Sequence, residues 1–307
     1  MDFVLNTLAS FVSLIPVTLA QSLILAFVVM GIMIPFRMLS FPDLTSEGAF
    51  PLGGCVCGVL MASGLPPVPA ILIALVAGFV AGCCTAFIHL RFRIHTLLAG
   101  ILMITMLYSI NLRIMGRSNI SVFGSPTVFD FVPFVRPGFP ASKIVVAGLI
   151  GLAVFALLLH FFRTEKGTAV RAVGANPDMA EAQGINVWFA TIGGVGLAGA
   201  LSATAGALMV QSQGFADVNM GLGILINGLA ALMIGEAIIG KSSLPRQLAA
   251  PFVGAIVYYQ LVSLCLAAGM PPPDLKLATG LFVLAMLALP SLKRRGGSAA
   301  ARETIRE

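Results

Sequence analysis

The sequence predicts an all-α fold, a polytopic bundle of transmembrane helices. Hydrophobic residues make up 58% of the 307 residues and charged residues only 10%, whereas a soluble domain carries about 25% charged residues. The mean hydropathy is +1.01. The apolar runs are long and continuous, and a membrane β-barrel would instead show short segments of alternating polarity. Because a helix satisfies its backbone hydrogen bonds internally, continuous runs of this kind indicate helices that cross a bilayer.

Nine apolar segments are expected to span the membrane, because each approaches the length of roughly 20 residues that a bilayer requires. Small residues recur four positions apart in several of them, as in Gly78 with Gly82, and this spacing lets helix backbones approach closely in lipid. We expect one transmembrane domain over residues 1–295 and a cytosolic tail over residues 296–307. The expected spans are residues 11–35, 46–63, 68–89, 94–114, 142–162, 188–211, 218–239, 247–269 and 274–291.

The longest polar interruption, residues 163–187, has internal order that a plain loop does not need. Asn176, Pro177 and Asp178 are typical of a helix start, with an N-cap, a proline at the first helical position and an acid in the first turn. Gly184 stands where a left-handed C-terminal cap would fall. The pattern predicts one short helix of about two turns. This segment is either a capped surface loop or an element that docks a soluble partner.

The placement of lysine and arginine predicts the orientation, because basic residues concentrate in cytosolic loops. If the loop at 163–187 is cytosolic, most of the 18 basic residues lie on its side. The N-terminus is then outside and the C-terminal tail is cytosolic. The cytosolic set is Arg37, Arg91, Arg93, Arg163, Lys166, Arg171, Lys241, Arg246, Lys293, Arg294, Arg295, Arg302 and Arg306. The outer set is Arg113, Arg117, Arg136, Lys143 and Lys276.

The net charge of +6 does not indicate nucleic-acid binding, since the basic residues are scattered and no basic run is interleaved with aromatic residues. Membrane lipid head groups and the orientation in the membrane explain the charge better. The five cysteines all lie inside apolar runs and none forms a CxxC pair. We therefore expect them to pack in the bundle and to hold no metal.

Two glycine motifs match nucleotide-binding patterns in spacing only. Residues 235–242, GEAIIGKS, have the phosphate-loop spacing, but they close a membrane span instead of following a strand. Residues 194–199, GVGLAG, have the dinucleotide spacing, but they lie inside an apolar helix, where close packing explains the glycines. We therefore expect no nucleotide site and no cofactor in this chain.

Two carboxylates open the second span. Asp43 follows an extended Phe-Pro pair, and Glu47 stands one helical turn later on the same face. A carboxylate deep in a bilayer costs about 2.5–3.5 kcal/mol, so both groups should face protein or water. Two interpretations are open. Either Asp43 caps the helix while Glu47 bonds a neighbouring helix, or the pair lines a translocation path.

The start of the seventh span echoes the start of the second. Residues 215–218, FADV, are similar to residues 41–44, FPDL, and the two copies enter from opposite faces. This arrangement is typical of an inverted repeat whose broken helices meet near the midplane, so we expect broken second and seventh spans. The polar residues near the seventh span that add surface for a path are Gln211, Asp217, Asn219 and Asn227.

The loop and the region around Asp43 resemble one transporter family. Residues 167–174, GTAVRAVG, followed by residues 181–186, EAQGIN, are similar to the coupling region of ATP-binding-cassette (ABC) importer permeases of the branched-chain amino-acid and ribose type. Residues 39–53 resemble the subgroup assigned to tryptophan or tyrosine uptake systems. The resemblance extends over nearly the whole chain, from about residue 15 to 290.

This resemblance implies a permease subunit in the bacterial cytoplasmic (inner) membrane that imports an aromatic or branched-chain amino acid or a similar small solute. It implies a cytosolic ABC ATPase that holds ATP and Mg²⁺, an extracytoplasmic solute-binding protein, and a second permease copy, as a homodimer or a heterodimer. The chain itself is then not an enzyme. The residues that would shape ATPase coupling are Gly167, Arg171, Ala172, Gly174, Asn176, Pro177, Glu181 and Gly184.

The alternative function is a proton-coupled secondary transporter, with Glu47, Asp217 and Glu236 as the proton relay. In the ABC interpretation, Asp43 and Glu47 are instead structural or path-lining groups. A purely structural membrane scaffold is disfavoured, because it would not require acids and amides at the ends of its spans.

Overall fold

The computed structural model describes residues 2–131, 140–271, 274–275, 277, 279–281 and 284. These residues are helical almost throughout, which confirms the predicted all-α polytopic fold. Six of the described helices are long and apolar enough to cross a membrane, and two apolar helices are shorter. The ninth expected span, 274–291, lies mostly outside the described residues, and the expected tail, 296–307, lies wholly outside them.

Apart from the starts of α1 and α9, the helix bounds follow the first eight expected spans to within about three residues. The long helices are α1 (Asp2–Met33, continued by the π-helical turn η1, Ile34–Met38), α3 (Pro67–Phe92), α4 (Thr96–Met115), α5 (Pro140–Arg163), α8 (Val187–Gln213) and α10 (Leu244–Ala267). The shorter apolar helices are α2 (Ser46–Ala62) and α9 (Ile224–Ile239). The remaining elements are β1 (Asn119–Ser121), the 3₁₀ turn η2 (Val128–Phe131), α6 (Glu165–Ala175), α7 (Pro177–Ala182) and β2 (Phe215–Asp217).

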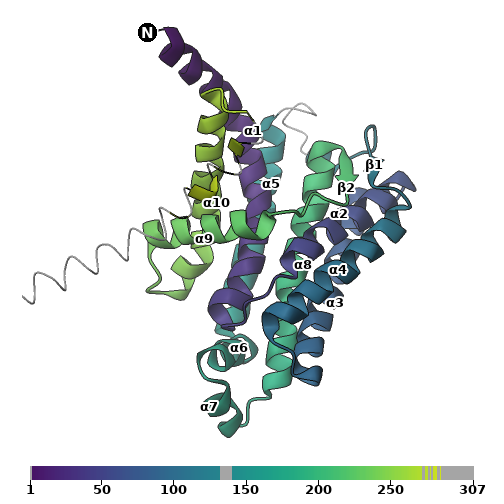
Figure 1. The fold of residues 1–307 in the computed structure, drawn as a ribbon, viewed down its shortest axis with the longest axis vertical. Coiled ribbons are helices and arrows are strands. Elements are labelled where there is room, and N and C mark those ends of the chain that lie inside the picture. Colours follow the sequence, from purple (N-terminus) through teal and green to yellow (C-terminus); the bar gives the residue numbers. More distant parts are fainter. Residues whose placement is uncertain are drawn as a thin grey trace, which may run out of the picture.

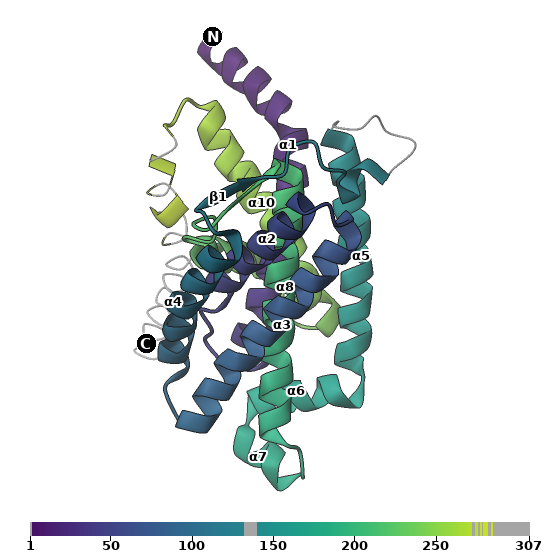
Figure 2. The same ribbon diagram turned by 90° about the vertical axis from the view of Figure 1, so that its right-hand side faces the viewer.

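Helix α8 is the centre of the bundle and packs against α1, α2 and α3 (Figures 1 and 2). Its many glycine and alanine residues let other backbones come close. Gly78 on α3 lies against the carbonyl of Gly199, and Gly82 lies against the carbonyl of Val195, so neither glycine has room for a side chain. The predicted small-residue packing is thereby confirmed, and the GVGLAG motif is a buried packing surface of α8.

The two ends of the bundle differ. Helices α6 and α7 lie at one end, whereas β1, β2 and the start of α1 lie at the other (Figure 1). Strands β1 and β2 pair antiparallel, with Ile120 opposite Ala216. The prediction that residues 215–218 open the seventh span was wrong, because their backbone pairs with β1 and α9 begins only at Ile224.

The second and seventh spans are broken, as expected. Helices α2 and α9 contain 17 and 16 residues, fewer than the roughly 20 that a full crossing requires. Non-helical backbone precedes each of them, over residues 39–45 and 218–223. In Figure 1, α9 runs across the common direction of α1, α5 and α8. The inverted-repeat relation between the two short helices stays a prediction.

The α3–α8 contact generates a stability prediction. Gly78→Val should lower the free energy of unfolding by about 1–3 kcal/mol, the usual cost of overpacking, because the new side chain meets the Gly199 carbonyl. Gly148→Val on α5 is the matched control, since a Cβ there meets nothing within 4 Å. Thermal unfolding of the detergent-solubilised chain measures both variants, and equal midpoints would contradict the close contact.

Candidate functional site

The first candidate site is the α6–α7 hairpin, residues 164–186. One short helix was expected in this loop, and the structure has two. Thr164 caps α6 by accepting a hydrogen bond from the N–H of Gly167, at 3.4 Å, and α6 buries Gly167, Val170 and Val173. Sequence reasoning missed α6 as a helix because glycines weaken helix propensity, yet its glycines lie where it packs against other backbone.

Helix α7 confirms the predicted start and end. The Asn176 Oδ1 atom accepts a hydrogen bond from the N–H of Met179 at 3.0 Å, and Pro177 is the first helical residue. Gly184 follows the last turn with a φ of +81°, a left-handed conformation that favours glycine. Ala180 is buried, whereas Met179 is 63% exposed. The cap residues therefore set the shape of α7 and leave an apolar side chain on its surface.

Backbone contacts seat α6 on the bundle. A side chain at Gly174 would clash with the carbonyl of Met38, the last residue of η1. A side chain at Gly167 would clash with the carbonyl of Phe161 near the end of α5. Ala172 is half-buried and packs against the main core. Three of the predicted coupling residues thus hold α6 in place instead of facing outward.

Arg171 and Glu181 form the outward face of the hairpin. Both side chains are exposed, and neither takes part in a hydrogen bond or ion pair within the described part of the chain. They are the two charged members of the predicted coupling set, and their position leaves them free to contact another molecule.

An ion-pair cluster lies next to η1, the turn against which α6 packs. The Arg37 Nε atom donates to Glu236 Oε1 at 2.7 Å, and its Nη2 atom donates to the other carboxylate oxygen. Lys241 Nζ lies 2.9 Å from Glu236 Oε2. The Glu236 side chain is only 6% exposed, so the cations balance a charge that would be costly alone. The lysine of the phosphate-loop-like motif at 235–242, Lys241, therefore pairs with Glu236 of the same motif.

Sequence reasoning did not pair Arg37 with Glu236, which are 199 positions apart. The available signal was a glutamate inside an apolar span, which needs a cationic partner. The pair ties η1, at the end of α1, to α9 near its C-terminal end. Since η1 also supports Gly174 of α6, the cluster links the α6–α7 hairpin to a broken span.

Asp43 lies in the non-helical segment ahead of α2. Its Oδ1 atom accepts hydrogen bonds from the Thr45 N–H, at 2.9 Å, and from the Thr45 hydroxyl. The Thr45 hydroxyl also lies 2.8 Å from that of Thr85 on α3. The prediction that Asp43 and Glu47 share one helical face was wrong, because Asp43 folds into a local turn and α2 begins at Ser46.

Glu47 joins the starts of the two short helices. Its Oε1 atom accepts a hydrogen bond from the N–H of Gly223 at 2.8 Å, and Gly223 is the N-cap of α9. The negative charge faces the positive end of the α9 dipole, which stabilises the contact. This bond between helices is one of the two roles that the sequence left open for Glu47.

The other predicted path residues hold loops and helix ends. Asp217 Oδ1 accepts a hydrogen bond from the N–H of Asn219 at 2.7 Å, and Asn219 itself is exposed. Gln211 is buried at the end of α8, where its Oε1 atom accepts from the N–H of Val128 at 2.9 Å. Its amide donates to the Pro67 carbonyl at 3.3 Å, which connects α8 to the start of α3.

A cavity of about 170 Å³ lies at the start of α9, lined by side chains from α1, α2, α8, α9 and α10. Of the six predicted path residues, Asn227 is the one that lines it, together with Gln213 and Tyr259. The Asn227 Oδ1 atom accepts a hydrogen bond from the Tyr258 hydroxyl at 2.9 Å. The cavity therefore has polar groups at the start of α9, next to the junction that Glu47 makes.

Comparison with known proteins identifies relatives over about nine tenths of the chain. A family model described as "Branched-chain amino acid transport system / permease component" matches residues 15–289. The tyrosine transport system permease protein of Clostridioides difficile is 36% identical over 274 residues, which cover 89% of this chain and 90% of that protein. An uncharacterized protein of Rickettsia prowazekii is 34% identical over 280 residues, which cover 90% of this chain and 96% of that protein.

A more distant relative is the ribose import permease protein RbsC of Escherichia coli (strain K12). It is 25% identical over 195 residues, which cover 63% of this chain and 60% of that protein. No solved structure matches this chain significantly.

The ion-pair cluster generates the second prediction. Arg37→Ala should destabilise the chain by about 1–3 kcal/mol, because the buried Glu236 carboxylate loses its bidentate hydrogen bonds to the guanidinium. The double variant Arg37→Ala with Glu236→Gln should recover part of that loss, since the buried charge that Lys241 alone would then balance is gone. Arg93→Ala, at an exposed position, is the control. Thermal unfolding of Arg37→Ala, Glu236→Gln and the double variant measures these effects. If the two single effects add up to that of the double variant, the pair contributes nothing to stability.

Proposed function

Because this chain belongs to the family of branched-chain amino-acid transport permeases, the permease components of ABC-type transporters, we propose that it is the translocation subunit of an importer driven by a separate cytosolic ATPase. Family membership makes the chain a multi-pass membrane protein and a transport component, not an enzyme. The observation that carries the proposal further is the α6–α7 hairpin at one end of the bundle, seated through its glycines and exposing Arg171 and Glu181.

The hairpin is the proposed docking element for the ATPase. Helix α7 extends farthest from the bundle at that end (Figure 2), and it presents the exposed Met179 as well as charged groups. A short, capped helix with mixed polar and apolar surface fits a groove on a soluble partner. Gly174 and Gly167 transmit force on the hairpin directly to the backbone of η1 and α5.

The same end of the bundle is proposed to be cytosolic, as the charge distribution favours. Helix ends and loops at the α6–α7 end carry Arg37, Arg91, Arg93, Arg163, Lys166, Arg171, Lys241 and Arg246. Those at the β1–β2 end carry Arg113, Arg117 and Lys143. The N-terminus and the β1–β2 ribbon then face outward, where an extracytoplasmic binding protein would deliver the solute.

The proposed solute is an amino acid, with an aromatic one favoured. The support is the 36% identity to a tyrosine transport system permease, against 25% identity to a ribose permease. The polar cavity at Asn227 is the proposed position of the path inside the chain, because it lies at the break before α9. A second permease copy, most simply an identical one, would complete the channel.

The proton-relay alternative has little support from the geometry. Glu47 bonds Gly223, Asp217 bonds Asn219, and Glu236 is held by Arg37 and Lys241. Direct hydrogen bonds among the three acids do not occur in the described part of the chain. Each acid has a structural partner of its own, whereas a relay requires groups within reach of one another.

Charge reversal on the hairpin tests the docking role. Arg171→Glu should weaken ATPase binding by about thirtyfold, the effect of losing a contact worth about 2 kcal/mol. Co-purification of the tagged chain with its co-expressed ATPase, and ATP-driven amino-acid uptake into proteoliposomes, measure the effect. Arg91→Glu is the matched control, since Arg91 is exposed on α3 at the same end. Full ATPase recovery and uptake in Arg171→Glu and in Glu181→Arg would remove the docking role.

A substitution under the hairpin separates docking from transmission. Gly174→Ala should leave Arg171 and Glu181 exposed but force α6 away from the Met38 carbonyl. We expect ATPase co-purification to persist while uptake per ATP hydrolysed falls severalfold, because η1 no longer follows the hairpin. Gly148→Ala, where a Cβ meets nothing within 4 Å, should behave as the wild type. Normal coupling in Gly174→Ala would show that force does not pass through this contact.

A further inference from the structure

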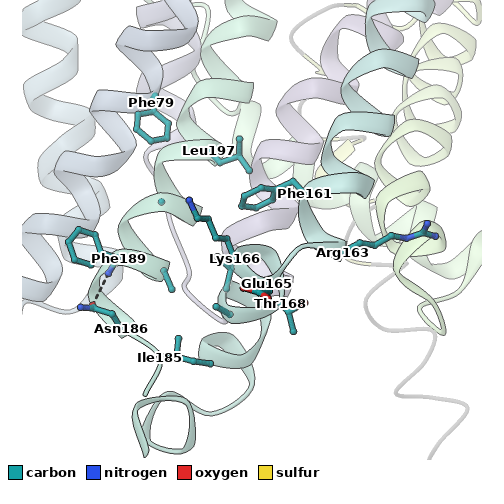
Figure 3. Close-up of a pocket in the computed structure, with 14 residues that line it drawn as sticks. Phe79, Phe161, Arg163, Glu165, Lys166, Thr168, Ile185, Asn186, Phe189 and Leu197 are labelled. Carbon is teal, nitrogen blue, oxygen red and sulfur yellow. Dashed lines mark hydrogen bonds between the residues drawn. The ribbon is translucent and has the colours of Figure 1, made fainter. Parts of the chain in front are cut away.

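A cleft of about 1020 Å³ lies between α3, α5, α6 and α8 (Figure 3). Its upper walls are apolar, with Phe79 from α3, Phe161 from α5 and Leu197 from α8. The exposed Phe189 of α8 forms another wall, and the first turns of α6 form the floor. The cleft thus lies beside the spanning helices, close to the α6–α7 end. The cleft shares part of the α6–α7 hairpin, but none of the proposed coupling residues lines it.

One cation points into this apolar space. Lys166, in the first turn of α6, extends its amine upward, below Leu197 and to the left of Phe161, whereas the Arg163 guanidinium points away from the cleft (Figure 3). Glu165 lies below, beside Thr168. Lys166 is exposed to the cleft and has no hydrogen bond or ion pair within the described residues. Lys166 lies just beyond the last residue of α5, at the end of a spanning helix. A lysine near the membrane surface attracts acidic head groups by about 1 kcal/mol, so an anionic partner there is favoured.

We propose that this cleft binds one anionic phospholipid from the leaflet at the α6–α7 end. The acyl chains occupy the apolar walls, and a phosphate oxygen accepts a hydrogen bond from Lys166 Nζ. Basic pockets between transmembrane helices are known sites for acidic head groups. The free N–H groups at the start of α6 add favourable partial charge for the phosphate. The proposal rests on the membrane-spanning fold and not on the solute or on the ATPase.

The surroundings of the cleft favour lipid over a second copy of this chain. Exposed apolar side chains on α3, such as Val76 and Val80, and on α5, such as Leu157, lie on the helices that flank the cleft. Acyl chains that cover those faces can enter the cleft without leaving the bilayer. A protein partner would need to bring a carboxylate to the end of the span beside these apolar walls, whereas acidic lipid head groups already lie at that level.

Native mass spectrometry of the full chain in micelles tests the proposal. With phosphatidylglycerol present, the wild type should retain one lipid more than with phosphatidylethanolamine. Lys166→Gln should reduce that retention about fivefold, the effect of one basic residue near a membrane surface, and Lys166→Arg should restore it. Arg91→Gln, at an exposed position at the same end but outside the cleft lining, should retain the lipid. Equal retention by wild type and Lys166→Gln would overturn the proposal.

A second variant tests the apolar part of the site. Gly193 lines the cleft, and a Cβ there meets nothing within 4 Å, so Gly193→Phe should fill the cleft and abolish lipid retention while Lys166 stays intact. Gly148→Phe, equally unobstructed but outside the lining, should retain it. Retention by Gly193→Phe, or displacement of the lipid by excess inorganic phosphate, would show that acyl chains do not occupy the cleft.

Photo-cross-linking identifies the occupant in membranes. A benzophenone side chain at position 193 should form an adduct with phospholipid. An adduct with a second copy of this chain, or with the ATPase, would replace the lipid proposal by a protein interface.

Discussion

Backbone hydrogen bonding inside the bilayer is the constraint on which the rest of this structure depends. Lipid offers no partner to a free N–H group, so the chain is helical wherever it crosses. Before α2 and α9 the helix is interrupted, and carboxylates accept from the N–H groups that the interruptions release. Asp43 accepts from Thr45, and Glu47 accepts from Gly223. Asp217 likewise accepts a hydrogen bond from the N–H of Asn219, two residues further along the same loop. The three acids near the starts of the short helices, Asp43, Glu47 and Asp217, are therefore acceptors for backbone N–H groups.

This constraint also shapes how the two ends of the bundle communicate. Helix α8 packs so tightly against α3 that their backbones touch, which makes that pair a rigid unit. Side chains from other elements hold α9 at both ends: Glu47 of α2 bonds its N-cap, and Arg37 of η1 bonds Glu236 near its C-terminus. The π-helical turn η1 carries Arg37 and supports α6, and such turns are frequent at functional sites. In the proposed importer, a displaced α6 would move η1 and thereby shift α9 relative to α8.

Local sequence rules predicted the elements whose cause is local. The cap residues Asn176 and Gly184 define α7, and both the start and the end of that helix are confirmed. Apolar length predicted the spanning helices, and glycine spacing predicted close packing between helices, while the pairing of α3 with α8 came from the structure. The errors occurred where a distant segment decides the conformation. Residues 215–217 form a strand because β1 lies beside them, and α6 forms although its glycines disfavour a helix, because it packs on backbone.

The sequence by itself determined that this chain is a helical membrane protein, where its long apolar helices lie, and where α7 begins and ends. Those properties follow from apolar length and from caps that act within four residues. Only the tertiary structure decided that Glu236 bonds Arg37, that Glu47 joins the starts of α2 and α9, and that Lys166 faces an apolar cleft. Such contacts join residues far apart in the chain, and the energy of a buried charge depends on neighbours that no local pattern specifies.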